Sequence, residues 1–184
     1  MKKFMLASTI LWGFLSPSFA SENFKNNIGL NLGYGQLTAK IQGEKREGDD
    51  FSGEIFYRKY VESKWGVELG YKAGFDGVNS ILISQLDEIK DLSYSGPRLS
   101  LYGEYPLALG FNIYGKTGLT FYETTYKRKK DGLVSEVSDS NVGGELTTGL
   151  GWSYGHIGMH IEANYMRDSV ISNKTVMFGL DIKF

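Results

Sequence analysis

The feature that most limits the fold of this chain is a strict alternation of apolar and polar residues in its last segment, Lys174 to Phe184. Successive side chains of a β-strand point to opposite faces, so a period of two predicts a strand with one apolar face. That face carries Val176, Phe178, Leu180, Ile182 and Phe184. The opposite face carries Met177, Gly179, Asp181 and Lys183.

The same alternation recurs along the chain and predicts eight strands in total. Glycine is frequent at 24 residues, proline is scarce at 3, and the 12 Tyr and 11 Phe favour strands over helices. The alternating stretches are residues 28–41, 51–62, 65–76, a stretch ending at 105, 111–127, 145–152, 157–165 and 174–184.

The predicted connections alternate in length, which bears on topology. Those after the second, fourth and sixth strands are a few residues long, and those after the first, third, fifth and seventh are longer. Transmembrane barrels with an even number of antiparallel strands have tight periplasmic turns and longer external loops. We therefore expect an all-β fold, an eight-stranded antiparallel up-and-down transmembrane β-barrel with both ends in the periplasm.

The N-terminal segment has the pattern of a cleaved signal peptide. Lys2 and Lys3 precede an apolar run over residues 4–15, and Ser18 and Ala20 form a small-x-small site before Ser21. The run is shorter than the roughly 20 residues of a membrane-spanning helix, and no other run in the chain approaches that length. We expect a signal peptide over residues 1–20, one barrel domain over 21–184, and no helical membrane span.

Charge and cysteine content exclude several classes of function. Loss of two of the 20 basic residues with the signal leaves 18 against 21 acidic residues, a net charge of −3 that gives no basic field for nucleic acid. Cysteine is absent, which removes disulfides, thiol catalysis, cysteine-ligated metals and a lipid-anchored N-terminus. We predict no cofactor, no metal site and no nucleic-acid partner.

Two features indicate which strand faces point inward. In a soluble, lipocalin-like barrel the apolar faces would line the interior, and periodicity alone leaves that alternative open. Aromatic residues of the apolar faces, however, stand at one level beside the short turns or the chain end, as in a membrane girdle: Trp65, Tyr105, Phe111, Trp152 and Phe184. Glycines recur on the polar faces, where a narrow interior needs small residues beside long charged ones. We therefore expect the apolar faces to meet lipid.

An inward polar face implies a charged interior. The expected members of this interior charge network are Glu54, Arg58, Glu68, Lys72, Arg98, Glu104, Lys116 and Glu145. We expect Glu54 and Glu68 to pair with Arg58 and Lys72, and Lys116 to lie opposite Arg98 and Glu104. An unpaired buried charge costs several kcal/mol, so a paired network that fills the lumen is favoured over a small gated pore, the alternative.

Three motifs resemble a known family: Tyr105-Pro106-Leu107, the stretch 114–119 (Tyr-Gly-Lys-Thr-Gly-Leu) and the stretch 66–71 (Gly-Val-Glu-Leu-Gly-Tyr). Over the whole mature chain they resemble the OmpA-type eight-stranded transmembrane domain. The resemblance implies an outer-membrane location amid lipid and lipopolysaccharide, and a non-enzymatic role in envelope structure and surface interaction. Larger relatives carry a peptidoglycan-binding domain after the barrel; this sequence ends at Phe184 with the barrel, and we do not expect wall tethering.

The last strand also resembles the targeting strand of bacterial outer-membrane barrels. That resemblance implies an assembly signal that the barrel-assembly machinery reads during insertion. Its residues are Phe178, Leu180, Ile182 and Phe184.

A hydrolase acting on lipid A or another outer-membrane substrate is the enzymatic alternative. The only histidines are His156 and His160, and Ser169 and Ser172 are the serines that could serve a Ser-His-acid arrangement. The His-x-Ser-Asn pattern of a lipid A deacylase is missing, because Ile161 and Glu162 follow His160. We expect His160 to be an interior residue bonded to a carboxylate, and we predict no catalytic residue.

Two segments are candidates for external contacts. Residues 78–92 are unusually apolar for an exposed connection, and they fit either a helical face or an extension of the strands above the membrane. This patch is a candidate contact for a host or phage surface protein; the alternative is a loop that folds its own apolar residues inward. The second segment is a run of four basic residues that could contact lipopolysaccharide phosphates or simply be solvated: Lys127, Arg128, Lys129 and Lys130.

Overall fold

A computed structural model describes residues 24–41, 44–76, 89–130 and 133–184. Within these residues, no α-helix is long and apolar enough to cross a membrane. The strands are β1 (Asn26–Ile41), β2 (Glu44–Glu62), β3 (Trp65–Asp76), β4 (Ile89–Pro106), β5 (Phe111–Lys130), β6 (Leu133–Tyr154), β7 (Ile157–Arg167) and β8 (Ile171–Lys183).

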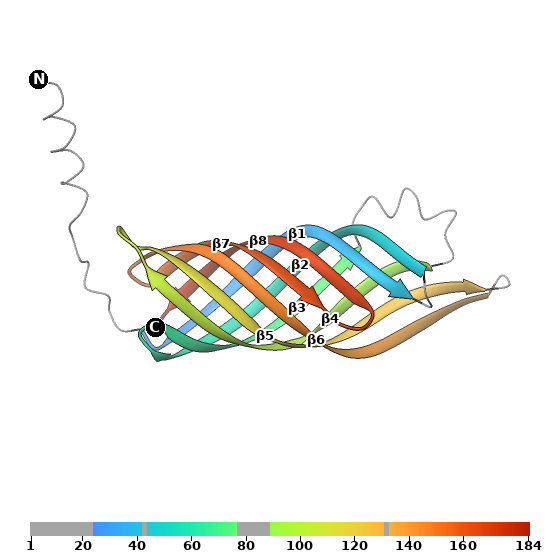
Figure 1. The fold of residues 1–184 in the computed structure, drawn as a ribbon, viewed down its shortest axis with the longest axis horizontal. Helices are drawn as coiled ribbons and strands as arrows, with labels where there is room; N and C mark the ends of the chain where they lie inside the picture. The colour runs from blue at the N-terminus through green and yellow to red at the C-terminus, as the bar shows by residue number, and fades with distance from the viewer. Residues whose placement is uncertain (1–23, 42–43, 77–88, 131–132) are drawn as a thin grey trace, which may run out of the picture.

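The eight strands form one closed antiparallel barrel in chain order (Figure 1). Each strand pairs with its sequence neighbours, and β8 pairs with β1 from Lys183 opposite Asn27 to Ile171 opposite Ala39. The seam is also closed at the end of the chain, where Asn26 and Phe184 exchange backbone hydrogen bonds of 2.9 Å in both directions. The predicted up-and-down eight-stranded barrel is confirmed.

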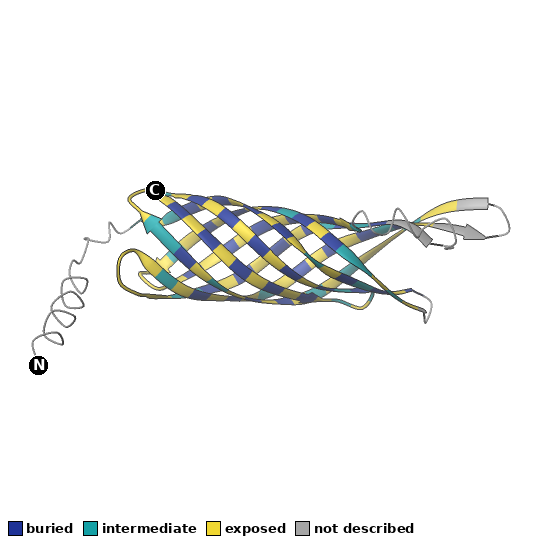
Figure 2. Cartoon of the chain, turned by 90° about the horizontal axis from the view of Figure 1, so that it is seen from above, coloured by how far each residue is buried: buried dark blue, intermediate teal, exposed yellow. Residues whose placement is uncertain are grey.

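Burial alternates along the strands within the body of the barrel and gives its wall a chequered pattern (Figure 2). In β3, Leu69 points outward and is 56% exposed, whereas the inward neighbours Glu68 and Lys72 are fully buried. Leu32 and Leu146 are outward and 63% and 62% exposed. An apolar outer wall around a charged interior suits a barrel that sits in lipid. The lipocalin-like alternative, with an apolar interior at this level, is wrong.

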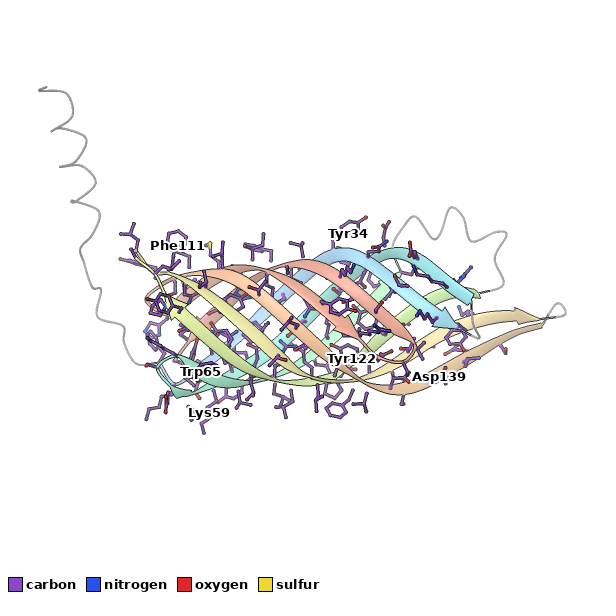
Figure 3. All side chains as sticks on the ribbon, in the orientation of Figure 1. Tyr34, Lys59, Trp65, Phe111, Tyr122 and Asp139 are labelled. Carbon is purple, nitrogen blue, oxygen red and sulfur yellow. The ribbon has the colours of Figure 1, made fainter. Side chains whose placement is uncertain are left out.

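The outward apolar residues form a belt with two aromatic edges. Trp65 and Phe111 lie at the end of the barrel that holds the chain terminus, and Tyr34 lies toward the other end (Figure 3). Beyond Tyr34 the next outward residues of β1 are Gln36, Thr38 and Lys40, and the outward side of β5 likewise changes from Phe121 to Glu123. The belt therefore has an upper boundary near these aromatic residues, and the strands continue above it.

Above the belt the sense of the pattern reverses. The outward residues of β1 are apolar through Tyr34, but from Leu37 the apolar residues of the same strand point inward. The pairing of β1 with β2 runs without a shift through this change, so the backbone alternation is continuous and only the residue chemistry reverses. In its outer part the barrel is thus polar outside and apolar inside, as a water-exposed barrel must be.

Most strands extend beyond the predicted ranges, and the largest extensions are at the outer ends. β2 begins at Glu44 rather than 51, β4 at Ile89, β6 at Leu133 rather than 145, and β8 at Ile171 rather than 174. The expected long connections after the first, fifth and seventh strands are therefore wrong: residues 42–43, 131–132 and 168–170 separate the strands there. The extra length lies in strand extensions above the belt. In the extensions of β2 and β6, polar residues on both faces hide the alternation.

The short connection between β7 and β8 has a local cause in Asp168. Its Oδ1 accepts hydrogen bonds of 2.7 Å from the backbone N–H groups of Val170 and Ile171, and its own N–H donates to the Ile171 carbonyl at 2.9 Å. An Asp side chain that bonds the backbone a few residues ahead stabilises a tight turn. Three residues are enough to reverse the chain here.

Candidate functional site

The charged interior is centred on Arg98 of β4, which contacts carboxylates from three other strands. Its Nε donates to Glu54 Oε1 at 2.7 Å, its Nη2 lies 2.5 Å from Glu68 Oε1, and its Nη1 lies 3.0 Å from Glu145 Oε1. Ser100 accepts from Nη1 at 2.9 Å and donates to Glu145. All five side chains are buried. One guanidinium, with its five donors, therefore joins β2, β3, β4 and β6 across the lumen.

Two further cations extend this cluster toward the periplasmic end. Arg58 Nε donates to Glu68 Oε2 at 2.7 Å, and its guanidinium carbon stands 3.5 Å from the centroid of the Tyr102 ring. Lys116 Nζ lies 3.2 Å from Glu68 Oε1 and 2.9 Å from Glu162 Oε2. Charge pairing and cation–π stacking both compensate for the loss of water around these buried cations.

The predicted pairing of Glu68 with Arg58 is confirmed, whereas Glu54 pairs with Arg98 and the other predicted partners differ. Lys72 lies opposite Glu54 in the β2–β3 register, but its Nζ donates to Asn164 Oδ1 at 3.0 Å across the lumen. Lys116 lies opposite Tyr102, and Arg98 lies opposite Thr120. Long side chains in a narrow barrel reach strands that are not their neighbours, so register alone does not give the partners.

Glu104 lies apart from the network, and Glu162 belongs to it. Glu104 is half-buried and accepts hydrogen bonds from Tyr102 at 2.6 Å and Asn112 at 3.0 Å, so its expected pairing with Lys116 is wrong. Glu162 was not predicted as a member of the network, although the alternation of β7 places it on the inward face and could have indicated it. With Glu162 in place of Glu104, four carboxylates meet four cations, including Lys72.

Gly70 leaves the space that the central guanidinium occupies. A Cβ atom at this position would stand 2.9 Å from Arg98 Nε and 2.8 Å from Glu54 Oε1. Both atoms belong to side chains held by several hydrogen bonds, so neither can move freely. A glycine facing the lumen is thus required beside the longest side chain, as the glycine pattern of the sequence indicated.

A second polar cluster lies farther along the lumen around Asp50. Its carboxylate accepts hydrogen bonds from Tyr94 OH at 3.1 Å, Asn173 Nδ2 at 2.7 Å and Thr175 Oγ1 at 3.0 Å. These residues come from β2, β4 and β8. Asp50 was not among the predicted interior residues, although it is four residues before Glu54 and so lies on the same inward face of β2.

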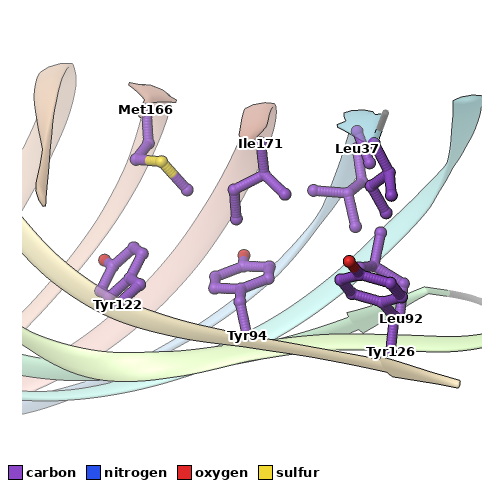
Figure 4. Close-up of a cluster of buried hydrophobic side chains, with 9 residues drawn as sticks. Leu37, Leu92, Tyr94, Tyr122, Tyr126, Met166 and Ile171 are labelled. Carbon is purple, nitrogen blue, oxygen red and sulfur yellow. The ribbon is translucent and has the colours of Figure 1, made fainter. Parts of the chain in front are cut away.

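An apolar cluster fills the outer part of the lumen (Figure 4). It combines side chains from β1, β4, β5, β7 and β8, all less than 10% exposed. Its members are Leu37, Ala39, Ile41, Leu92, Tyr94, Tyr122, Tyr126, Met166 and Ile171. The described lumen is therefore filled by ion pairs within the belt and by apolar packing above it, an arrangement that opposes ion passage.

His160, the histidine considered for a Ser-His-acid arrangement, contacts a carboxylate and an amide rather than a serine. His160 Nδ1 lies 3.1 Å from Asp181 Oδ1, and its Nε2 lies 2.8 Å from Asn31 Oδ1. The expected carboxylate partner of His160 is confirmed. Ser169 instead donates to Asn141 at 2.6 Å beyond the far end of β7, so the structure does not bring it to His160. Among the described residues, no group of three or more His, Cys, Asp or Glu could hold a metal ion.

The predicted assembly-signal residues point outward on β8 and at Phe184, which follows it. Phe178, Leu180, Ile182 and Phe184 are each between 52% and 56% exposed and lie in the apolar belt. Their strand closes the barrel against β1. Within the finished barrel these side chains would contact lipid.

The predicted apolar loop at residues 78–92 is only partly described. Residues 78–88 lie outside the described residues, and Ile89 to Leu92 belong to β4 rather than to a loop. Leu92 is 8% exposed and packs in the apolar cluster of the outer lumen. Of the alternatives for this segment, an extension of the strands above the membrane is confirmed for Ile89 to Leu92, and Leu92 points into the lumen rather than toward an external partner.

The β5–β6 hairpin extends farther beyond the belt than the other described strands (Figure 1). The basic run Lys127–Lys130 is the end of β5, not a loop, and it pairs with residues 133–136 of β6. Lys127 is exposed and lies opposite Glu136. The four positions are thus presented in pairs with β6 rather than on a separate loop.

One edge of this hairpin is open. The pairing of β6 with β7 begins only at Gly144 opposite Arg167, and residues 133–143 pair with no other strand within the described part of the chain than β5. Near the base of this open edge, Ser169 donates to Asn141. An unpaired strand edge presents backbone N–H and C=O groups that another extended segment can bind.

Comparisons with known proteins agree with this architecture. The sequence family described as outer membrane protein beta-barrel domain matches residues 6–184. No curated protein sequence matches the chain.

Solved structures with the same fold have distant sequences. Neisserial surface protein A is 11% identical with a TM-score of 0.68, over 86% of this chain and 97% of that one. The attachment invasion locus protein Ail of Yersinia pestis is 16% identical with a TM-score of 0.57, over 87% and 99%. The N-terminal β-barrel domain of Pseudomonas aeruginosa OprF is 11% identical with a TM-score of 0.50, over 86% and 99%.

Proposed function

Because the chain belongs to the outer membrane protein β-barrel family and is located in the outer membrane, we propose that it is a non-enzymatic surface protein whose β5–β6 hairpin binds external partners. The barrel anchors and orients the hairpin amid lipid and lipopolysaccharide. The single observation that carries this proposal is the open edge of β6 at residues 133–143, above the apolar belt.

An open edge is a binding surface of known chemistry. An extended segment of a partner can add to it as a further strand, with main-chain hydrogen bonds for affinity and side chains for selection. The edge strand carries Glu136 and Asp139, both exposed, which favour a partner segment with basic residues. A rigid, filled barrel holds this edge in one orientation and lowers the entropic cost of binding.

Two proteins of similar structure, Neisserial surface protein A and Ail, have names consistent with a role at the cell surface. Ail is an attachment invasion locus protein, and one of its crystal structures holds the heparin analogue sucrose octasulfate. For this chain we propose that Lys127, Arg128, Lys129 and Lys130 contact the phosphates of neighbouring lipopolysaccharide, since Lys and Arg bind phosphate through charge-assisted hydrogen bonds. The partner at the open edge is then a surface protein of a host cell or a phage.

A hairpin truncation tests this function. Glu123 and Ser140 are opposite each other in the β5–β6 register, so an Asn-Gly turn can join them directly. The matched control joins Thr38 to Glu47 in the β1–β2 hairpin in the same way. Bacteria that express each form are compared for adhesion to an epithelial monolayer and to immobilised heparin, with surface levels equalised by antibody.

We expect cells with the full-length protein to adhere more than empty-vector cells. Cells with the β5–β6 truncation should adhere no more than empty-vector cells, and cells with the β1–β2 truncation should adhere as well as those with the full-length protein. Adhesion that is equal for full-length and empty-vector cells, or that survives loss of the β5–β6 hairpin, would contradict the proposed function.

A further inference from the structure

A groove crosses the outer wall of the barrel where Gly53, Ala73 and Ser95 place small residues side by side. Leu32, Gly53, Ala73, Ser95 and Glu123 are successive cross-strand partners on β1 to β5 and all point outward. The groove has a volume of about 970 Å³. Its floor is the backbone around Gly53 and Ala73.

Large side chains flank this floor on both sides. Phe51 and Phe75 form one ridge, with ring centroids 5.6 Å apart, and Ile55 and Tyr71 form the other. These four side chains are each between 44% and 52% exposed. A Cβ atom at Gly53 would meet only Leu32 Cδ2 at 3.7 Å and the Asn31 carbonyl at 3.9 Å, so the floor there is open.

The groove is apolar at one end and polar at the other. Leu30, Leu32, Phe178 and Leu180 line the end within the belt. The end at the upper belt boundary is lined by hydroxyls and one carboxylate, from Ser93, Ser95, Glu123 and Thr125. A site with this gradient fits an amphiphile, with its chain toward the belt and its head toward the boundary.

A basic residue lies just above the polar end. Lys127 is the next outward residue of β5 after Thr125, and it is exposed. Its ammonium group complements a phosphorylated headgroup. The hydroxyls and the Glu123 carboxylate complement sugar hydroxyls and amide N–H groups.

We propose that this groove binds one lipid A moiety of lipopolysaccharide, with an acyl chain between the two ridges and the phosphorylated glucosamine at the polar end. Lipid tails are as apolar as the wall, so hydrophobicity does not favour one lipid over another. The groove fits an acyl chain by its shape, and contacts with the headgroup must select lipid A over other lipids. Lipid A is the phosphorylated, acylated sugar lipid of the external leaflet, which this end of the belt meets. The inference rests on the outer-membrane location and is independent of partner binding at the β5–β6 hairpin.

Two matched substitutions test the groove. Ala73→Phe fills its floor, and Ala163→Phe places the same ring outward on β7, at a position away from the groove. Both alanines are exposed on the outer wall, so both variants should fold. Each protein is extracted from outer membranes in mild detergent, and native mass spectrometry measures the lipids that remain bound and the oligomeric state.

We expect the unaltered protein and Ala163→Phe to retain one lipopolysaccharide per chain, and Ala73→Phe to retain roughly tenfold less, a difference of about 1.4 kcal/mol. Equal retention by both variants would overturn the proposal. So would a groove-dependent phospholipid in place of lipopolysaccharide, or a dimer that Ala73→Phe dissociates, because the occupant would then be another lipid or a second copy. Absence of any retained lipid from the unaltered protein would overturn it as well.

Discussion

Replacing Arg98 with methionine tests how the charged interior is held. Methionine keeps much of the stem but removes the cation that contacts Glu54 and Glu145, while Glu68 keeps Arg58 and Lys116. Removal of one partner from a buried ion pair costs about 3–5 kcal/mol. Because two buried carboxylates lose the guanidinium here, we expect a loss near the upper end, about 5 kcal/mol in the free energy of unfolding.

The assay is urea unfolding of residues 21–184 in phospholipid vesicles, followed by tryptophan fluorescence. Trp65 and Trp152 are the tryptophans of this segment. Trp65 lies at the belt edge near the chain terminus (Figure 3), and Trp152 lies opposite Phe111 at the same edge. Lys59→Met is the matched control, since Lys59 is exposed on the outer wall, and its effect should stay within about 0.5 kcal/mol.

Charge balance supplies a second test of the same reasoning. Arg98→Met leaves three cations against four carboxylates, and adding Glu54→Gln restores equal numbers. The double variant should recover part of the loss, with a coupling of about 1–3 kcal/mol. If Arg98→Met lowers stability by no more than Lys59→Met, the interior charges are hydrated rather than paired, and the filled-lumen interpretation is wrong.

The remaining predictions concern the wall, the last strand and the lumen. Leu69→Arg, outward in mid-belt, should cost about 2–4 kcal/mol in the same unfolding assay, and a harmless outcome would contradict a lipid-facing wall. Phe184→Asp should lower the amount that reaches the outer membrane, as measured by cell fractionation; unchanged levels would exclude an assembly signal there. In planar bilayers the unaltered protein should conduct poorly and Glu68→Ala better, whereas a large steady conductance in both would favour the pore.

The sequence predicts the barrel within the belt because two constraints act together there. Lipid outside and a narrow lumen inside force apolar and polar residues to alternate, so Leu69 and Glu68 are assigned to opposite faces from sequence alone. Above the belt the outer face meets water. Because water permits polar residues on the outer face, Ser and Asp occupy both faces of residues 133–142 in β6. This part of the strand therefore lacks the alternation from which strands are predicted.

The reversal of pattern was nevertheless present in the sequence of β1. Apolar residues fall at even positions through Tyr34 and at odd positions from Leu37 to Ile41. When the apolar residues of one strand move from its outward to its inward face, the change indicates the level at which the barrel leaves the membrane. The partners inside the lumen carry no such signal, because Arg98 contacts Glu145 from a strand that is not its neighbour.

Surface labelling of single cysteines tests most directly whether the barrel spans the outer membrane with the β5–β6 hairpin outside the cell. The sequence has no native cysteine, so only the introduced residue can react. Ser138→Cys stands on the β5–β6 hairpin, Glu62→Cys at a short turn, and Leu69→Cys in the belt. With a membrane-impermeant maleimide on intact cells, we expect Ser138→Cys to be labelled, Glu62→Cys only after the outer membrane is permeabilised, and Leu69→Cys in neither case. Labelling of Glu62→Cys but not Ser138→Cys on intact cells would contradict an outer-membrane barrel that presents this hairpin to the outside.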